Sequence, residues 1–267
     1  DEHKTMKIKI AVNAASGKMG QQVINQVTSH KEAELSAAFC RPEHRLLGRQ
    51  VGFTDVLYSD NVSTGLEGSD VVIDFSLPEG TFGLLDKAVE TKTPVIIGTT
   101  GFNDEEIARI KKAGETVPVL LAPNTSIGVN SALVLLAKAA KMLGKQADIE
   151  IIESHHKHKI DAPSGTAIRM GQTIAEAMGE NFDDLKVTES RFEKRTRKKG
   201  EIGMSVIRAG EIIGEHKVLF ALDNEIISIE HKAQNRHCFA EGAVAAAVWL
   251  AEQKPGFYTM QDFLADS

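Results

Sequence analysis

The chain has 267 residues, of which 42% are hydrophobic and 25% charged, as in an average soluble globular protein of one or two domains. Its net charge of −6 disfavours binding to nucleic acid or to a membrane surface. No apolar run approaches the roughly 18 residues that a membrane span needs, and no secretory signal pattern is present. Its two cysteines, Cys40 and Cys238, form neither a disulfide framework nor a zinc spacing. We therefore expect a cytoplasmic enzyme or binding protein.

The first half of the chain alternates strand and helix patterns. A short apolar strand at 8–12 precedes an amphipathic helix at 17–30 and a second strand at 33–39, which together form a parallel βαβ unit. The same alternation predicts strands at 70–75, 93–98 and 117–122 and helices at 79–91 and 103–113. Such a series indicates an α/β fold with an open, doubly wound parallel sheet of the Rossmann type.

The second half has a different organisation. A long helix capped by Thr125 or Ser126, a strand at 149–152 and a helix at 166–178 are followed by a polar loop or irregular edge at 180–200. Strand patterns then follow closely at 203–208, 212–222 and 225–231, before an alanine-rich helix at 239–252. Strands without intervening helices predict an antiparallel or mixed sheet, and hence a second domain of the α+β class.

The first strand-to-helix turn is a candidate cofactor loop. A dinucleotide fold needs small residues there so that backbone N–H groups can approach a pyrophosphate. The turn consists of Ala14, Ala15, Ser16, Gly17, Lys18 and Met19. The usual G-x-G-x-x-G spacing does not fall on its glycines, so an ordinary strand-to-helix connection remains an equal alternative.

Three further segments extend the candidate cofactor site. Cys40 and Arg41 stand where an acidic residue would hold a ribose hydroxyl pair, and an arginine there suits a 2′-phosphate, although a solvated surface arginine is the alternative. Two more segments follow the fourth and fifth strands, at the edge where ligands bind in open α/β sheets. They contain Gly98, Thr99 and Thr100, and Ala122, Pro123, Asn124 and Thr125.

The chain concentrates reactive side chains between Glu153 and Thr166. The stretch contains three histidines, two lysines and a Pro-Ser-Gly-Thr turn that opens a helix. One interpretation is a metal site, but the histidines lack the i, i+4 spacing of helical zinc motifs. A second is a solvated basic loop. The favoured one is a proton-transfer and anion site, because imidazole titrates near neutrality and helix N-termini bind carboxylates.

These residues give the chain a close resemblance to the dihydrodipicolinate reductases of bacterial lysine and diaminopimelate synthesis. The family signature, Glu-x-His-His-x-x-Lys-x-Asp-x-Pro-Ser-Gly-Thr-Ala, is matched throughout by Glu153 to Ala167. The segments 71–76, 98–102 and 208–211 also look like the family. Its usual glycine loop is altered, because Ala14 and Ser16 carry a β-carbon where family members commonly have glycine.

The resemblance implies a cytoplasmic homotetramer that reduces a cyclic dicarboxylate with NADPH or NADH. It implies a Rossmann domain at 1–126, completed by 236–267, and a substrate-binding and tetramerisation domain at 127–235 with an open mixed sheet. It makes His155 and Lys159 the proton-transfer residues. Substrate would bind to His156, Ser164, Gly165 and Thr166. Because Cys40 replaces the acidic residue that selects NADH in many members, Arg41 predicts a preference for NADPH.

Two other functions remain open from the sequence. Another two-domain NAD(P)-dependent dehydrogenase would share the first domain but would not need the His-His-x-x-Lys run joined to Ser-Gly-Thr. A cofactor-sensing protein without catalysis could keep the fold, and the altered glycine loop is the feature that favours it. The presence of both His155 and Lys159 argues against this last alternative.

Overall fold

The computed structural model describes residues 6–187 and 195–267. The chain divides into two compact units: unit 1 comprises the chain up to Ile127 together with His237–Ser267, and unit 2 comprises Gly128–Arg236. Within the described ranges, no helix is both long and apolar enough to span a bilayer.

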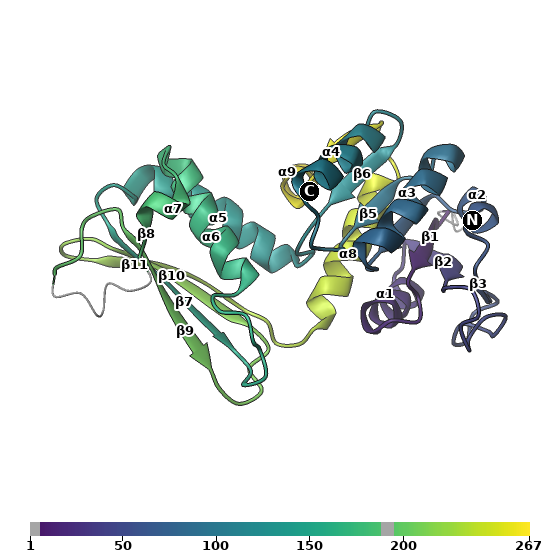
Figure 1. Cartoon of the computed structure of the whole chain (residues 1–267), viewed down its shortest axis with the longest axis horizontal. Helices are drawn as coiled ribbons and strands as arrows, with labels where there is room; N and C mark the ends of the chain where they lie inside the picture. Colours follow the sequence, from purple (N-terminus) through teal and green to yellow (C-terminus); the bar gives the residue numbers. More distant parts are fainter. Residues whose placement is uncertain (1–5, 188–194) are drawn as a thin grey trace, which may run out of the picture. The chain divides into compact units, whose positions relative to one another are not determined.

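Unit 1 is built on a seven-stranded sheet in which every strand pair is parallel (Figure 1). The strand order is β12-β6-β5-β4-β1-β2-β3. It comprises β1 (Ile8–Asn13), β2 (Ala33–Phe39), β3 (Tyr58–Ser59), β4 (Val71–Asp74), β5 (Val95–Ile97), β6 (Pro118–Leu121) and β12 (Gly256–Tyr258). The order reverses between β1 and β4, which is the switch point where open α/β sheets bind their ligands.

Helices cover both faces of this sheet. One face packs against α1 (Lys18–Ser29) and α8 (His237–Leu250). The other face packs against α2 (Val62–Glu67), α3 (Pro78–Thr91) and α4 (Asp104–Ala113). Alternate residues of each central strand therefore enter opposite cores, which is why these strands read as continuous apolar runs. The short helix α9 (Met260–Ala265) follows β12.

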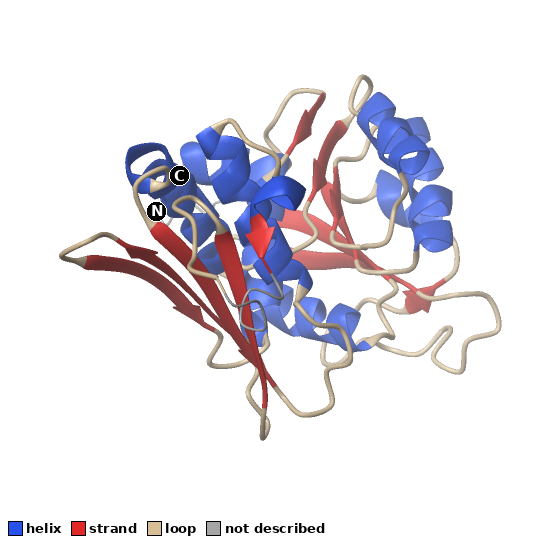
Figure 2. Ribbon diagram, turned by 60° about the vertical axis from the view of Figure 1, so that its left-hand side comes forward, coloured by secondary structure: helices blue, strands red, loops and turns tan. Residues whose placement is uncertain are grey.

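Unit 2 has a five-stranded mixed sheet with helices on one face (Figure 2). The strand order is β11-β10-β7-β9-β8, where β7, β9 and β8 run parallel and β10 is antiparallel to both of its neighbours. The strands are β7 (Asp148–His155), β8 (Lys186–Val187), β9 (Ile202–Arg208), β10 (Glu215–Ala221) and β11 (Ile226–Lys232). The helices are α5 (Ile127–Leu143), α6 (Gly165–Met178) and α7 (Phe182–Leu185).

The predicted fold class is confirmed, and the differences concern short elements. The structure adds β3, α2 and β12, which are too short to produce a clear period in the sequence. The segment 180–200, expected to be a polar loop or an irregular edge, contains the four-residue helix α7 and the two-residue edge strand β8, while 188–194 lie outside the described residues. Strand β7 extends to His155, three residues beyond the expected end, because it stays paired with β9 and β10.

Candidate active site

The carboxyl end of β7 carries a cluster of titratable side chains that cross-strand pairing assembles. Glu153 on β7 lies opposite His216 on β10, and His216 lies opposite His231 on β11. On the other side, His155 pairs with Arg208 of β9. Successive strand residues alternate between faces, so all five side chains lie on the face that the helices cover. Side chains from a stretch of 79 residues, 153 to 231, thereby lie together in one row across the sheet.

Glu153 is the centre of the cluster. Its side chain is 1% exposed, and its carboxylate accepts two hydrogen bonds from the guanidinium of Arg208, at 2.8 and 2.9 Å, and one from the backbone N–H of Ser164, at 2.9 Å. The Nδ1 atom of His155 lies 2.5 Å from the same carboxylate. Burial raises the pKa of Glu153, but the bonds from Arg208, His155 and Ser164 outweigh burial and leave that pKa below its usual value. The group is therefore a buried carboxylate anion.

The N-terminus of α6 lies beside this carboxylate. Ser164 is the N-cap: its hydroxyl accepts a hydrogen bond from the N–H of Ala167 at 3.1 Å and lies 2.9 Å from Nε2 of His216. Gly165 and Thr166 are the first two residues of the helix, at its positive end. The first turn of this 14-residue helix carries no acidic side chain. It therefore suits a carboxylate ligand.

The loop after β7 contains the other predicted site residues. The ammonium of Lys159 is 2.8 Å from the carboxylate of Asp161, and this hydrogen bond is the main reason that the pKa of Asp161 is lowered. His156 has a buried Nδ1 atom without a hydrogen-bond partner. A buried polar atom without a partner is costly in a folded protein, so a ligand that pairs with it gains that energy.

A metal site is the alternative reading of the histidines, and the structure changes its members. Glu153, His155 and His216 offer ligand atoms within 4.8 Å of one another, whereas the sequence had pointed to His155, His156 and His158. The bidentate guanidinium of Arg208 already neutralises the carboxylate and disfavours a second cation beside it. The cluster is better described as a hydrogen-bonded network.

His216 makes the stability of unit 2 depend on pH. Burial, and next the nearby His155, lower the pKa of His216 from 6.5 to about 4. Between pH 6.5 and 4, His216 is therefore protonated in the unfolded chain but neutral in the folded chain. Because the unfolded state binds this extra proton, the free energy of unfolding should fall as pH drops through that range. We expect urea denaturation to show this decline, and the His216→Asn variant, which keeps a polar partner for Ser164, to show a flatter one. Equal slopes in both proteins would contradict the assignment.

In unit 1, a buried carboxylate ties together the carboxyl ends of three strands. Asp74 at the end of β4 is 0% exposed. It accepts hydrogen bonds from Asn13 at the end of β1, at 2.9 Å, from Thr81 of α3, at 2.6 Å, and from Thr99 after β5, at 3.0 Å. Hydrogen bonds from neutral donors to a charged acceptor are stronger than those between two neutral groups. They hold the sheet edge on both sides of the switch point in one geometry.

The first strand-to-helix turn is the candidate cofactor loop predicted from the sequence. Gly17 is exposed and precedes α1, whose 12 residues begin without an acidic side chain. Ser16 is partly exposed and Lys18 exposed, while Ala15 and its methyl group lie in the core. Ala14 has φ 49°, the left-handed region that favours glycine. Ala14 therefore holds, at a cost in local strain, a conformation that glycine adopts freely.

The other predicted cofactor residues lie on the same edge of the sheet. Cys40 is buried and Arg41 exposed, directly after β2. Gly98 is required because the aromatic ring of Phe75 packs against it, so that an added β-carbon would lie 2.2 Å from that ring. Thr99 is engaged by Asp74, and Thr100 is exposed.

The segment after β6 connects this edge to α8. Thr125 donates a hydrogen bond to the backbone carbonyl of Phe239 at 2.6 Å, and Asn124 accepts one from the N–H of Ser126 at 2.9 Å. Ala122 is buried, and Pro123 is exposed. The predicted residues of unit 1 therefore gather at the ends of β1, β2, β5 and β6, and the predicted residues of unit 2 gather at the end of β7 and the start of α6.

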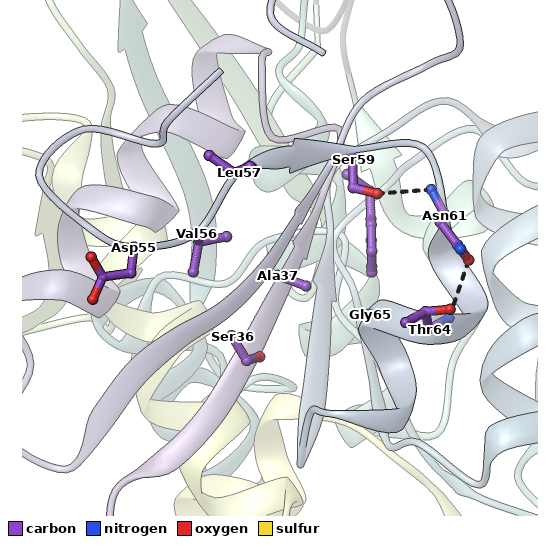
Figure 3. Close-up of a pocket in the computed structure, with 10 residues that line it drawn as sticks. Ser36, Ala37, Asp55, Val56, Leu57, Ser59, Asn61, Thr64 and Gly65 are labelled. Atoms are coloured by element: carbon purple, nitrogen blue, oxygen red, sulfur yellow. Dashed lines mark hydrogen bonds between the residues drawn. The ribbon is translucent and has the colours of Figure 1, made fainter. Parts of the chain in front are cut away.

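Unit 1 also has a pocket of about 400 Å³ beside β2, β3 and α2 (Figure 3). It contains none of the predicted site residues. Part of its polar lining serves the helix: the hydroxyl of Ser59 accepts a hydrogen bond from the N–H of Asn61, and the Asn61 side chain accepts one from the N–H of Thr64. We assign no ligand to this pocket.

Sequence reasoning did not assign Glu153, Arg208, His216 or Asp74 to a site. Arg208 and His216 lie in strands far along the chain, and only the register of β7, β9 and β10 brings them to Glu153. One signal was available: a charged or imidazole residue on the inward face of an otherwise apolar strand is rarely buried without a partner. Asp74 ends a run of buried apolar residues in the same way.

A chain that has both a parallel Rossmann-type unit with a hydroxyl-lined sheet edge and a second unit with a buried carboxylate–histidine cluster has the features of an oxidoreductase that uses a pyridine nucleotide. Two family descriptions match the chain: dihydrodipicolinate reductase, N-terminus, over residues 8–125, and dihydrodipicolinate reductase, C-terminus, over residues 128–264. The chain belongs to the dihydrodipicolinate reductase family.

Similar proteins agree with this membership. A 4-hydroxy-tetrahydrodipicolinate reductase of Ralstonia pickettii (strain 12J) is 46% identical over 262 residues, covering 96% of this chain and 99% of the relative. One from Polynucleobacter necessarius is 45% identical, with 96% and 98% covered. The dipicolinate-bound dihydrodipicolinate reductase of Paenisporosarcina sp. TG-14 superposes with a TM-score of 0.80 at 26% identity, over 95% of this chain and 98% of that one. A probable dehydrogenase from Thermotoga maritima, at 14% identity and a TM-score of 0.64, shares the fold.

Proposed function

We propose that this chain reduces 4-hydroxy-tetrahydrodipicolinate to tetrahydrodipicolinate in the pathway to diaminopimelate and lysine. The observation that carries the proposal is the joint placement of His155 and the α6 N-terminus around one buried carboxylate, Glu153. A cyclic dicarboxylate that gains a hydride and a proton needs both an anion site and a proton-transfer group. Proton transfer and carboxylate binding thus come from a single rigid cluster.

The proposed roles follow from the position of each group. Loss of the 4-hydroxyl group as water leaves a C=C bond conjugated with the ring C=N bond, and a reduced nicotinamide, when bound, would supply hydride to the ring carbon at the far end of that conjugated system. His155 and Lys159 transfer the proton that accompanies the shift of electrons to nitrogen. The N–H groups of Gly165 and Thr166 receive a substrate carboxylate, and the partnerless Nδ1 of His156 adds a polar contact. Ser164 shapes the turn, because its hydroxyl already contacts Ala167 and His216.

Oxidation of NADPH by the purified chain in the presence of freshly formed 4-hydroxy-tetrahydrodipicolinate tests the reaction. We expect a substrate-dependent fall in absorbance of the reduced cofactor and inhibition by the planar dicarboxylate dipicolinate. A chain that binds the cofactor but does not oxidise it with this substrate would contradict the proposal and favour a cofactor-sensing protein.

We propose the cofactor-binding role for the edge of unit 1, from the turn 14–19 and Cys40–Arg41 to the segments 98–100 and 122–125. Support comes from the exposed N-terminus of α1 and from the fixed geometry that Asp74 gives to the neighbouring strand ends. NADP(H) is the proposed cofactor and NAD(H) a possible second one, because the exposed guanidinium of Arg41 suits a 2′-phosphate.

The cofactor preference yields a quantitative expectation. Steady-state kinetics should give a higher kcat/KM with NADPH than with NADH. Replacing Arg41 with glutamine should lower the ratio of the two by about tenfold, the equivalent of ~1.4 kcal/mol for one lost charged contact. Arg109→Gln, which removes an exposed arginine paired with Asp86, serves as the control and should leave the ratio unchanged. A wild-type preference for NADH would contradict the role of Arg41.

We also propose a homotetramer that assembles through the sheet of unit 2. The face of this sheet away from the helices carries apolar side chains, among which Ile207 is 45% and Ile226 64% exposed. Exposed apolar surface of this kind is typical of interaction sites. Light scattering on the purified chain should give four times the 29.0 kDa of one subunit, and Ile226→Glu should shift the mass towards smaller species. A monomer with full activity would contradict the assembly.

A further inference from the structure

We propose that Glu153 is the positioning residue of the proton-transfer step: its carboxylate accepts the Nδ1 hydrogen of His155, so that Nε2 is the atom which exchanges the proton with the substrate. Gly214 keeps the space beside that atom open. The inference rests on the proposed reductase function and specifies which nitrogen of the His155 imidazole exchanges the proton.

The tautomer of His155 follows from the chemistry of its partner. An ionised carboxylate can only accept hydrogen bonds, and Glu153 is ionised because Arg208 and Ser164 donate to it. Nδ1 of His155, at 2.5 Å from this carboxylate, must therefore carry the hydrogen. In the neutral imidazole the lone pair then resides on Nε2, and in the cation Nε2 carries the mobile proton.

The carboxylate also fixes where the imidazole stands. Two bonds from Arg208 hold both oxygens of Glu153 in a fork, and the Ser164 N–H joins the carboxylate to the N-cap of α6. The ring of His155 packs edge-on against that of His216, with 5.1 Å between centroids. The proton-transfer group and the proposed carboxylate site therefore cannot move independently.

Gly214 lies against the other edge of the imidazole. A β-carbon at this position would be 3.2 Å from Nε2 of His155 and 3.5 Å from its Cδ2 atom. The first distance is tighter than ordinary van der Waals contact, so a methyl group would crowd the nitrogen that must reach the substrate. The backbone of Gly214 has no positive φ, so alanine can adopt its conformation.

Nitrogen NMR of the full-length protein with ¹⁵N-labelled histidine tests the tautomer directly. We expect the His155 signals, assigned by their loss in His155→Asn, to show a protonated Nδ1 and an unprotonated Nε2 in the neutral ring. In Glu153→Gln the amide can also donate, so the preference for this tautomer should weaken. A neutral His155 with its hydrogen on Nε2 in the wild type would overturn the proposal.

Kinetics provide the second readout. We expect Glu153→Gln to lower kcat at least ~10-fold with little change in KM for the cofactor, as for other residues that orient a reacting group. The control is Glu176→Gln, which removes a carboxylate paired with Arg169 on the exposed side of α6 and should leave kcat unchanged. If Glu153→Gln does not fold, Gly214→Ala, which leaves all hydrogen bonds in place, should still lower kcat.

The results separate this inference from the reaction itself. An active wild type whose Glu153→Gln or Gly214→Ala variant folds and turns over at the wild-type rate overturns the positioning role and leaves the reductase function intact. An inactive wild type overturns the function, while the NMR tautomer still reports on Glu153 and His155.

Discussion

Replacing His155 with asparagine is expected to lower kcat by about 10²- to 10⁴-fold, the usual contribution of a general acid or base. Asparagine keeps an N–H donor close to the position of Nδ1, so the contact with Glu153 can persist while the transferable proton is lost. The fold and the cofactor site in unit 1 should therefore be unaffected. Steady-state kinetics and fluorescence titration with NADPH measure the two properties separately.

His158→Asn is the matched control for this experiment. His158 belongs to the same run of histidines, but its side chain is 68% exposed and its nearest acidic partner is Glu211, at 3.7 Å. We expect near-normal kcat in this variant. Near-normal turnover in His155→Asn as well would remove His155 from the chemistry and would shift the proton-transfer role to Lys159.

Replacing Gly20 with alanine is expected to destabilise unit 1 and to weaken cofactor binding together. An added β-carbon would lie 2.3 Å from the carbonyl oxygen of Ala14 and 2.8 Å from Cα of Ala15. Both are backbone atoms of the candidate pyrophosphate turn, so the clash can be relieved only by moving that turn. We expect a loss of about 3 kcal/mol in the free energy of unfolding, near the upper end for overpacking, and a raised KM for NADPH.

Gly83→Ala provides the comparison. Gly83 is an exposed residue of α3 with no atom within 4 Å of an added β-carbon. Alanine there should stabilise the helix by roughly 0.5–1 kcal/mol, because it restricts the unfolded chain more than glycine does. Urea denaturation of both variants decides the point. Equal stability of Gly20→Ala and the wild type would show that the turn is not held by this contact.

At the altered glycine loop, the sequence gives the identity of the residue and the structure gives its backbone conformation. The substitution of glycine by Ala14 is plain in the sequence, but its consequence depended on the backbone. The structure shows φ 49° at Ala14, so this residue occupies the left-handed region despite its β-carbon. Spacing alone could not give this angle, because φ is set by the helix and strands that the turn joins.

The sequence by itself determined the fold class, the family and the reactive stretch 153–166. These follow from local signals, namely the alternation of strand and helix patterns and a run of residues whose types and spacing are specific. The partly buried loop residues Lys159 and His156 also belong to that run.

Only the tertiary structure decided which side chains complete the site. Arg208 and His216 join Glu153 because β9 and β10 flank β7 in one register, and a shift by one residue would turn each of them to the opposite face of the sheet. Strand register depends on contacts between residues that lie more than 50 positions apart, as Glu153 and Arg208 do. The hydrophobic pattern and the secondary-structure propensity of a sequence depend on residues close together in the chain, so they could not predict this strand register.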